Sequence, residues 1–137
     1  MKKLILIACV GCFSLMSCAQ KSNDKIPAAV KSAFAKKYPT VKKAKWEVED
    51  KNFEVSFEEN ELDISILYDA QGNEKEVERE INMKDLPQAV LDYISKNYSG
   101  AKIQETAKIT DDKGISKYEV EIKGKDLIFD LNGNLIK

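Results

Sequence analysis

The sequence predicts an α+β fold built from a tandem repeat, in which each copy has one helix followed by a four-stranded antiparallel unit. Two observations lead to this prediction. The stretch from Ile26 to Pro39 returns 60 residues later as Leu86 to Ser99, and each copy continues into short alternating segments separated by turn residues. We expect the helices to pack on one face of the sheet and to leave the other face open.

Each copy begins with an amphipathic helix. Apolar residues recur at every fourth position, which places them on one stripe of a helix. They are Ile26, Val30, Phe34 and Tyr38 in the first copy and Leu86, Val90, Ile94 and Tyr98 in the second. Pro27 and Pro87 suit the first turn, where a missing N–H costs no hydrogen bond. Asp24 and Asp85 stand just upstream and are the expected capping residues.

Alternation of apolar and polar residues predicts the strands. In the first copy they cover approximately residues 43–49, 53–58, 62–68 and 74–81. In the second copy they cover residues 102–110, 118–122 and 127–131, with a short end at Leu135-Ile136. The stretch Asp69–Asn73 and its counterpart Asp130–Asn134 supply turn residues, with a glycine that can adopt positive φ.

The offset between the two copies changes along the chain. It is 60 at the helices, 65 between Phe53 and Tyr118, and 61 between the turns that begin at Asp69 and Asp130. The second copy therefore has a longer first hairpin and a shorter second one. Because side chains alternate with period two, a change of two residues on each strand preserves the inward face. We expect the copies to differ in hairpin length and not in register.

The first residues are typical of an export signal. Lys2 and Lys3 precede an apolar run that is too short to span a bilayer, and Leu15-Met16-Ser17-Cys18 resembles the bacterial lipobox. This resemblance implies a lipidated Cys18; the alternative is an ordinary signal peptide that is cut nearby. The predicted organisation is a signal peptide (1–17), the lipidated cysteine with a flexible tether (18–25), and two repeats (26–81 and 82–137) that form one domain.

Composition excludes several kinds of site. The chain has no histidine, and its three cysteines, Cys9, Cys12 and Cys18, all lie in the leader. Histidine-dependent triads, cysteine nucleophiles in the domain and most zinc sites are therefore excluded. Removing residues 1–17 takes away Lys2 and Lys3 and shifts the net charge from −1 to −3, which argues against nucleic acid as a partner. We expect no enzyme activity, no cofactor and no metal site.

The aspartate-containing turns also bear a faint similarity to calcium loops. Residues 69–74 and 130–134 combine aspartate, a side-chain amide and glycine. Neither stretch has the alternating acidic ligands or the distal glutamate that a calcium ion needs. A hairpin turn with a left-handed glycine is the favoured interpretation.

The open face of the sheet is the candidate functional surface. If the apolar strand residues face the helices, the acidic ones face outward, with Leu67 and Ile128 as apolar points among them. These acidic residues are Glu47, Glu49, Glu54, Glu58, Asp63, Glu119, Glu121 and Asp126. Such a face could bind a basic peptide, a cationic region of a partner or loosely held divalent ions, or it could only keep the protein soluble. Trp46 is expected in the core.

The paired helix and four-strand layout, the Asp-x-x-Gly-Asn turns and the lipobox together resemble the PepSY-like lipoproteins of Bacteroidetes, whose fold is similar to the β-lactamase inhibitory protein. PepSY domains are linked to restraint of secreted peptidases. The resemblance implies a non-catalytic envelope lipoprotein that binds or inhibits a protein or peptide partner. The chain lacks the inhibitor's aromatic-rich contact surface and its disulfides, which argues against β-lactamase as the target.

A second hypothesis is a structural or accessory lipoprotein that senses or buffers a small ligand or a divalent cation. A contact site formed by the hairpin from Asp111 to Lys117 beside the acidic face would favour the binding module. A ligand-sized cleft between the half-domains, or carboxylates that converge on one point, would favour the second hypothesis. In both cases we expect the chain to be lipid-anchored in the cell envelope and to face the periplasm, with the outer membrane favoured.

Overall fold

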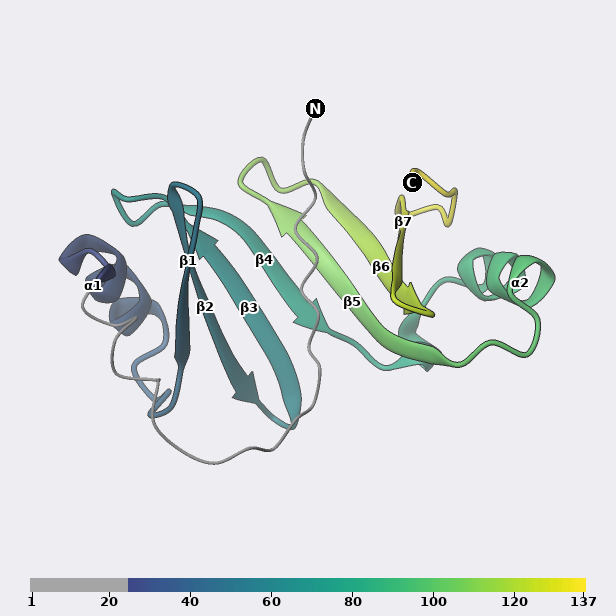
Figure 1. The fold of residues 1–137 in the computed structure, drawn as a ribbon, viewed down its shortest axis with the longest axis horizontal. Coiled ribbons are helices and arrows are strands. Elements are labelled where there is room, and N and C mark those ends of the chain that lie inside the picture. Colours follow the sequence, from purple (N-terminus) through teal and green to yellow (C-terminus); the bar gives the residue numbers. More distant parts are fainter. Residues whose placement is uncertain (1–24) are drawn as a thin grey trace.

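The computed structural model describes residues 25–137, which form two helices and one antiparallel sheet of seven strands (Figure 1). The elements of the first repeat are α1 (Ala28–Lys37), β1 (Lys45–Glu49), β2 (Asn52–Glu59), β3 (Leu62–Tyr68) and β4 (Glu74–Glu80). Those of the second are η2 (Met83–Asp85), α2 (Gln88–Asn97), β5 (Ile103–Asp111), β6 (Ser116–Ile122) and β7 (Lys125–Phe129). The strands lie in chain order from β1 to β7, so the predicted α+β fold class is confirmed. The signal peptide, Cys18 and the expected cap Asp24 lie outside the described residues.

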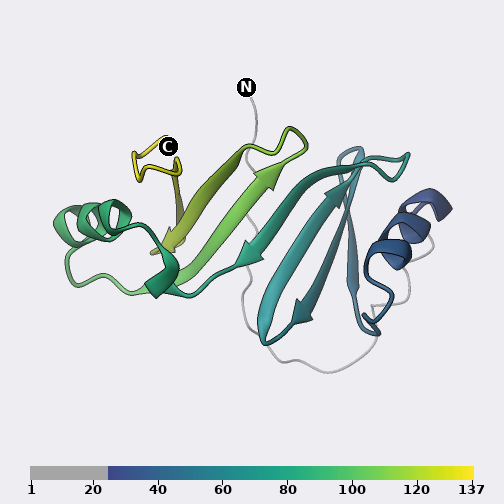
Figure 2. The same ribbon diagram turned by 180° about the vertical axis from the view of Figure 1, so that it is seen from behind.

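Both helices pack on the same face of the sheet. The strand pairing defines one row of neighbouring residues across β2 to β7: Phe57, Ile64, Arg79, Lys108, Tyr118 and Phe129. Phe57 contacts Phe34 of α1 at one end of this row, and Phe129 contacts Tyr93 of α2 at the other. The helices lie at opposite ends of the sheet, with β4 and β5 between them (Figures 1 and 2).

The first half of the core lies between α1 and strands β2 and β3. The predicted helix stripe is buried throughout, with Val30 fully inaccessible and Tyr38 only 8% exposed. The ring of Phe34 lies 5.3 Å, centroid to centroid, from both Trp46 and Phe57 in edge-on contacts. Aromatic pairs in this geometry add about 0.5–1.5 kcal/mol each beyond the area they bury. The prediction that Trp46 belongs to the core is confirmed.

The second half of the core repeats this arrangement around α2. Val90 and Phe129 are fully buried, and the rings of Tyr93 and Phe129 pack edge-on at 5.4 Å. The buried residues form two clusters, one under each helix. Each repeat therefore buries its own helix, and the pairing of β4 with β5 joins the two halves into one sheet.

The structure corrects the predicted capping. Pro27 and Pro87 are themselves the residues that precede the helices, and neither helix has a side-chain cap. The carbonyl of Pro87 accepts hydrogen bonds from the N–H groups of Val90 and Leu91. Asp85 does not cap α2, because it lies in the 3-10 turn η2, where its own N–H donates to Asn82.

The predicted short end of the second copy forms one bridge and no strand. Leu135 pairs with Phe129, and the N–H of Ile136 donates to the carbonyl of Ile128 at 2.7 Å. The N–H of Ile128 donates in turn to Lys137 at 3.0 Å. Because the hydrogen bonds of residues 136 and 137 all go to Ile128, no regular strand ladder forms. These residues still cover part of the outer edge of β7.

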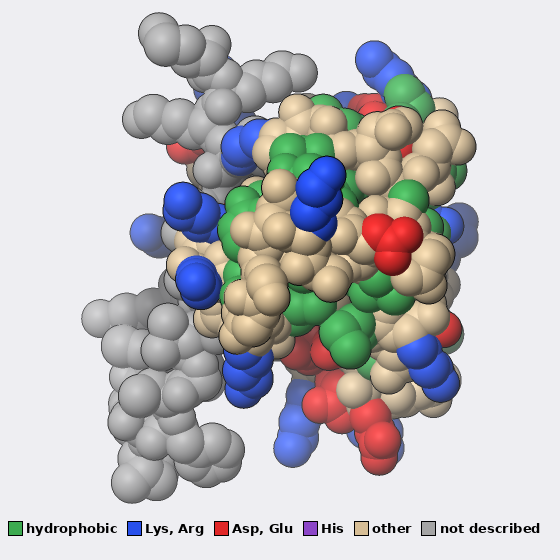
Figure 3. All heavy atoms as spheres, turned by 90° about the vertical axis from the view of Figure 1, so that its right-hand side faces the viewer, with side chains coloured by type: hydrophobic (Ala, Val, Ile, Leu, Met, Phe, Trp, Pro, Cys, Tyr) green, Lys and Arg blue, Asp and Glu red, His purple; other side chains and the backbone are tan. Residues whose placement is uncertain are grey.

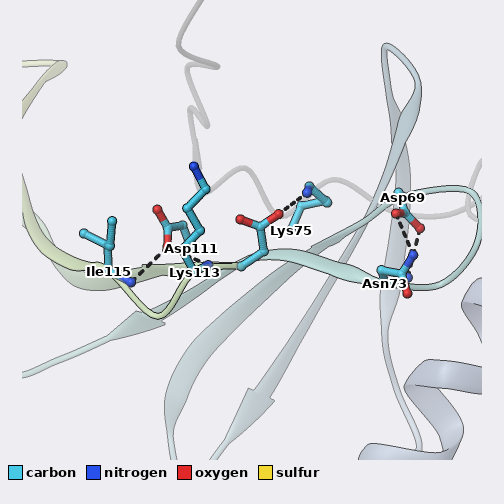
Figure 4. Close-up of polar contacts among 7 residues, drawn as sticks. Asp69, Asn73, Lys75, Asp111, Lys113 and Ile115 are labelled. Carbon is cyan, nitrogen blue, oxygen red and sulfur yellow. Dashed lines mark hydrogen bonds and ion pairs between the residues drawn. The ribbon is translucent and has the colours of Figure 1, made fainter.

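Three turns share one construction, in which an aspartate carboxylate accepts hydrogen bonds from its own turn. Figure 4 shows two of them, at Asp69 and Asp111. The Oδ1 atom of Asp69 accepts hydrogen bonds from the N–H groups of Gln71 and Asn73, both at 2.9 Å. The turns at Asp111 and Asp130 repeat this pattern at the same distance. Hydrogen bonds from the Asn73 side chain and then from its backbone hold the pKa of Asp69 below its usual range. The predicted turn conformation, with glycine at positive φ, is confirmed at Gly72 and Gly133.

Candidate functional site: the acidic sheet face

We define the acidic sheet face as the side of the sheet opposite α1 and α2, where carboxylates from most strands are exposed or half-buried. All eight predicted residues lie on this side. Glu47 stands opposite Glu54, Glu58 opposite Asp63, and Glu121 opposite Asp126, so each pair shares one face. The strand ladders therefore bring together carboxylates at both ends of the sheet, on β1 to β3 and on β6 and β7.

Further carboxylates, which were not predicted from the sequence, connect these two groups. Glu76, Glu78 and Glu80 of β4 point to the same side, and Glu105 of β5 continues the band towards β6. Alternation with Val77 on β4 was the sequence feature that could have identified the three glutamates of β4. With these residues the band of carboxylates runs from β1 to β7.

Glu54 is the most buried carboxylate of this face, at 6% exposure. Its Oε1 atom accepts hydrogen bonds from the hydroxyl groups of Ser56, at 3.3 Å, and Ser65. Ser56 and Ser65 are themselves directly opposite each other on β2 and β3. Glu54 is thus held inside the sheet, so a partner would meet the other carboxylates first.

Burial and mutual repulsion raise the pKa values of several carboxylates. Loss of hydration, followed by the neighbouring charges of Glu119 and Glu105, raises the pKa of Glu78 to about 8. Loss of hydration and repulsion by Asp126 raise the pKa of Glu119 to about 7. The pKa of Glu49 also rises to about 7, through loss of hydration and then contact with Glu54. Near neutral pH the face therefore carries carboxylates that are partly protonated and readily ionised by a nearby cation.

The face is not uniformly charged. Ala107 and Ile109 of β5 and Ile128 of β7 are buried on this side, and Leu67 of β3 is half-buried. Carboxylates separate these apolar residues, with Glu119 between Ala107 and Ile128 and Glu76 beside Leu67. Lys45 is a basic residue within the band, and it pairs with Glu47 at 2.5 Å. Viewed from the α2 end, most of the visible acidic side chains lie in the lower part of the molecule, another lies apart from them, and basic side chains are spread over the surface (Figure 3).

The turn between β5 and β6 and the turn between β3 and β4 lie at the same end of the strands (Figure 1). Its tip is tied to β4 by an ion pair between Lys75 and Asp112, and by a 3.0 Å hydrogen bond from the Asp112 N–H to the carbonyl of Lys75 (Figure 4). Ile115 at the tip is 56% exposed. These contacts with β4 hold the tip of the hairpin in place, and the side chain of Ile115 is exposed to solvent.

The described part of the chain has neither a cluster of metal-binding side chains nor a helix that could span a membrane. Among residues 25–137, no three acidic side chains are placed so that they could hold a metal ion together. Neither helix in this range has the length and apolar character needed to cross a membrane.

Two half-domains lie side by side, each with a helix over its share of one continuous antiparallel sheet. They define a tandem α+β module without a recognisable catalytic centre in the described residues. The chain belongs to the family described as "Putative beta-lactamase-inhibitor-like, PepSY-like", which matches it twice, at residues 18–74 and 60–137. No catalytic family is indicated. No curated protein matches the chain.

Several solved structures share the fold. A DUF2874 family protein from Bacteroides uniformis superposes with a TM-score of 0.72 and 24% identity, over 81% of this chain and 86% of that one. A protein from Bacteroides eggerthii, described as a putative periplasmic protein, gives 0.74 and 17% over the same shares. A BLIP-like protein from Bacteroides fragilis gives 0.64 and 23%, over 81% of this chain and 84% of that one. At these identities the likeness establishes the fold alone.

Proposed function

We propose that this protein is a non-catalytic module of the cell envelope that binds a basic segment of a protein or peptide through the acidic sheet face. The observation that carries the proposal is the band of carboxylates from β1 to β7. Lysine or arginine side chains of the segment would pair with the exposed carboxylates of this band. The family description and the BLIP-like relative support a role in binding or inhibition.

The proposed location follows from the leader and from the relatives. Cys18 would carry the lipid and residues 19–25 would tether the domain to the membrane, with the outer membrane favoured. Relatives described as putative periplasmic proteins support a domain that faces the periplasm. Two or more acyl chains would anchor the protein stably, which a single chain does not.

A pair of charge reversals tests the face. We expect Glu58→Lys combined with Asp63→Lys to weaken binding of a fluorescent lysine-rich peptide at least about tenfold, because both exposed carboxylates face each other in the band. Anisotropy titration of the wild type and the variant at fixed ionic strength measures this change.

The matched control is Asp85→Lys combined with Asp92→Lys. These exposed residues belong to η2 and α2, and the substitutions change the net charge by the same amount. We expect the control to lose no more than about twofold, which reflects long-range charge alone. Equal losses in both double variants, or no difference between the lysine-rich peptide and its glutamine counterpart, would remove the acidic face as the binding site.

Binding should also depend on pH. Between pH 6 and 8 we expect affinity for the lysine-rich peptide to rise, on the order of tenfold, because Glu49 and Glu119, with pKa values of about 7, ionise while the peptide keeps its charge. Glu119→Gln should flatten the profile. An affinity that is constant or falls over this range contradicts a site made of these carboxylates.

A further inference from the structure

A groove of about 560 Å³ crosses the helix side of the sheet between the two half-domains. It lies over β4 and β5, where Figures 1 and 2 show no helix above the sheet. Val77 and Thr110, which are paired across the two strands, form part of its lining. Its volume falls in the range of about 300–1,000 Å³ that is usual for small-molecule sites.

The lining contains four basic and four acidic residues, so their arrangement decides the sign of the groove. These residues are Lys37, Lys75, Arg79, Lys108, Glu74, Glu76, Asp111 and Asp112. Two of the four acidic groups form ion pairs with lysines of the lining. Glu74 pairs with Lys37 at 2.6 Å and accepts from the hydroxyl of Tyr68 at 3.2 Å, and Asp112 pairs with Lys75.

The two remaining acidic groups keep their charge, but by register they belong to the opposite side of the strand pair. The carboxylate of Asp111 accepts two backbone N–H groups of its own turn, and Glu76 lies in a register position of the acidic sheet face. Arg79 and Lys108 are left as the charged groups on the helix side of the strand pair. The lining as a whole carries no net formal charge, but the positive charge left unpaired within it is concentrated on the helix side of the strand pair, at Arg79 and Lys108.

Arg79 and Lys108 stand directly opposite each other on β4 and β5. Like charges in this position destabilise a sheet unless an anion lies between them. Arg79 is held in place by a 3.1 Å hydrogen bond to the hydroxyl of Tyr38, and its contact with Glu59 is long, at 3.8 Å. No carboxylate within residues 25–137 pairs with Lys108.

We propose that this groove binds a small anionic ligand, whose carboxylate or phosphate group lies between Arg79 and Lys108. The guanidinium supplies a planar set of donors that matches either group, and the lysine adds a mobile second charge. The hydroxyl of Tyr38 fixes the guanidinium from the side of α1. Arg79 and Lys108 lie on the side of the sheet opposite the acidic sheet face, with which the groove shares Glu76.

The test is a titration of the isotope-labelled full chain with citrate and with pyrophosphate at constant ionic strength, followed by amide chemical shifts. We expect saturable shifts at Arg79, Lys108 and Thr110. Because Lys108 is exposed and pairs with no described carboxylate, Lys108→Gln should fold normally and weaken binding about tenfold. Lys125→Gln, an exposed lysine on β7, serves as the control and should change little.

Arg79→Lys keeps the charge but removes the planar fork, so it should also weaken the preferred anion. Tighter binding of pyrophosphate assigns a phosphate ligand, and tighter binding of citrate assigns a carboxylate ligand. The proposal is overturned if neither anion gives saturable shifts in the groove, if the shifts spread over all surface lysines, or if Lys108→Gln and Lys125→Gln bind equally.

Discussion

Gly133→Ala is expected to destabilise the protein by about 2–4 kcal/mol, measured as the free energy of unfolding in urea. Gly133 has a φ of 85°, and a Cβ atom there would come within 2.6 Å of the Cβ of Ala89 on α2. The turn that begins at Asp130 thus rests directly on the first turn of the helix. An added methyl group would separate the two and disturb the core around Phe129 and Val90.

Gly114→Ala provides the matched control. Gly114 has a similar φ of 78°, but no other group lies within 4 Å of the position that its Cβ would occupy. Its substitution should cost only the backbone strain of a left-handed alanine, about 1 kcal/mol. A cost at Gly133 no larger than at Gly114 would show that contact with α2 contributes nothing.

Gly72 occupies the equivalent place on α1, with one difference. Its Cβ would lie 2.8 Å from the backbone carbonyl oxygen of Ala29. At Gly133 the nearest obstacle is the side chain of Ala89, so adding Ala89→Gly to Gly133→Ala should recover part of the lost stability. The recovery is reduced by about 1 kcal/mol, which is the cost of a glycine inside a helix. No side-chain deletion can relieve Gly72→Ala in the same way.

The parts of the fold that repeat within each copy were predictable from the sequence. The four-residue spacing of Val90 and Ile94 fixes which side of α2 is buried, and period-two alternation fixes the inward faces of β2 and β3. The same alternation placed all eight acidic residues on one face. The capping prediction was wrong, because a proline that precedes a helix already supplies the first carbonyl and Asp85 lies in a separate 3-10 turn.

Features at the junction of the two copies were not predictable from either copy alone. The pairing of β4 with β5 places Glu78 beside Ile109 and Arg79 beside Lys108, and these neighbours are about 30 residues apart in sequence. A register shift between Ile103 and Glu105 also interrupts the alternation of β5. The surroundings of Glu78 and the anionic-ligand groove both arise from this single strand pairing.

Glu78→Gln is expected to stabilise the protein by about 2 kcal/mol at pH 8 and above, and to have little effect near pH 5. Glu78 lies on β4 with Ser65 on one side and Ile109 on the other. Loss of hydration and the charges of Glu119 and Glu105 raise its pKa to about 8, from an ordinary value of 4.5. The folded protein therefore holds a proton that the unfolded chain has already released.

The direction of the pH effect follows from this difference. Between about pH 4.5 and 8 the folded state binds more protons than the unfolded state, so the stability of the wild type falls as pH rises through that range. Glutamine keeps the shape of the side chain and has no charge to bury, so the variant should lose less stability over the same range. Glu119 also has a raised pKa, of about 7, so the stability of the variant should still fall with rising pH, but less steeply than that of the wild type.

Urea unfolding at a series of pH values from 5 to 9 measures both effects, with Glu58→Gln as the control. Glu58 is an exposed carboxylate on the same face, and its substitution should change stability by less than about 0.5 kcal/mol at every pH. Parallel curves for the wild type and Glu78→Gln would mean that Glu78 is ionised in the folded state without cost. Diverging curves would establish that the centre of the acidic sheet face is strained by its own charge, and that a cationic partner bound there would relieve the strain and release protons.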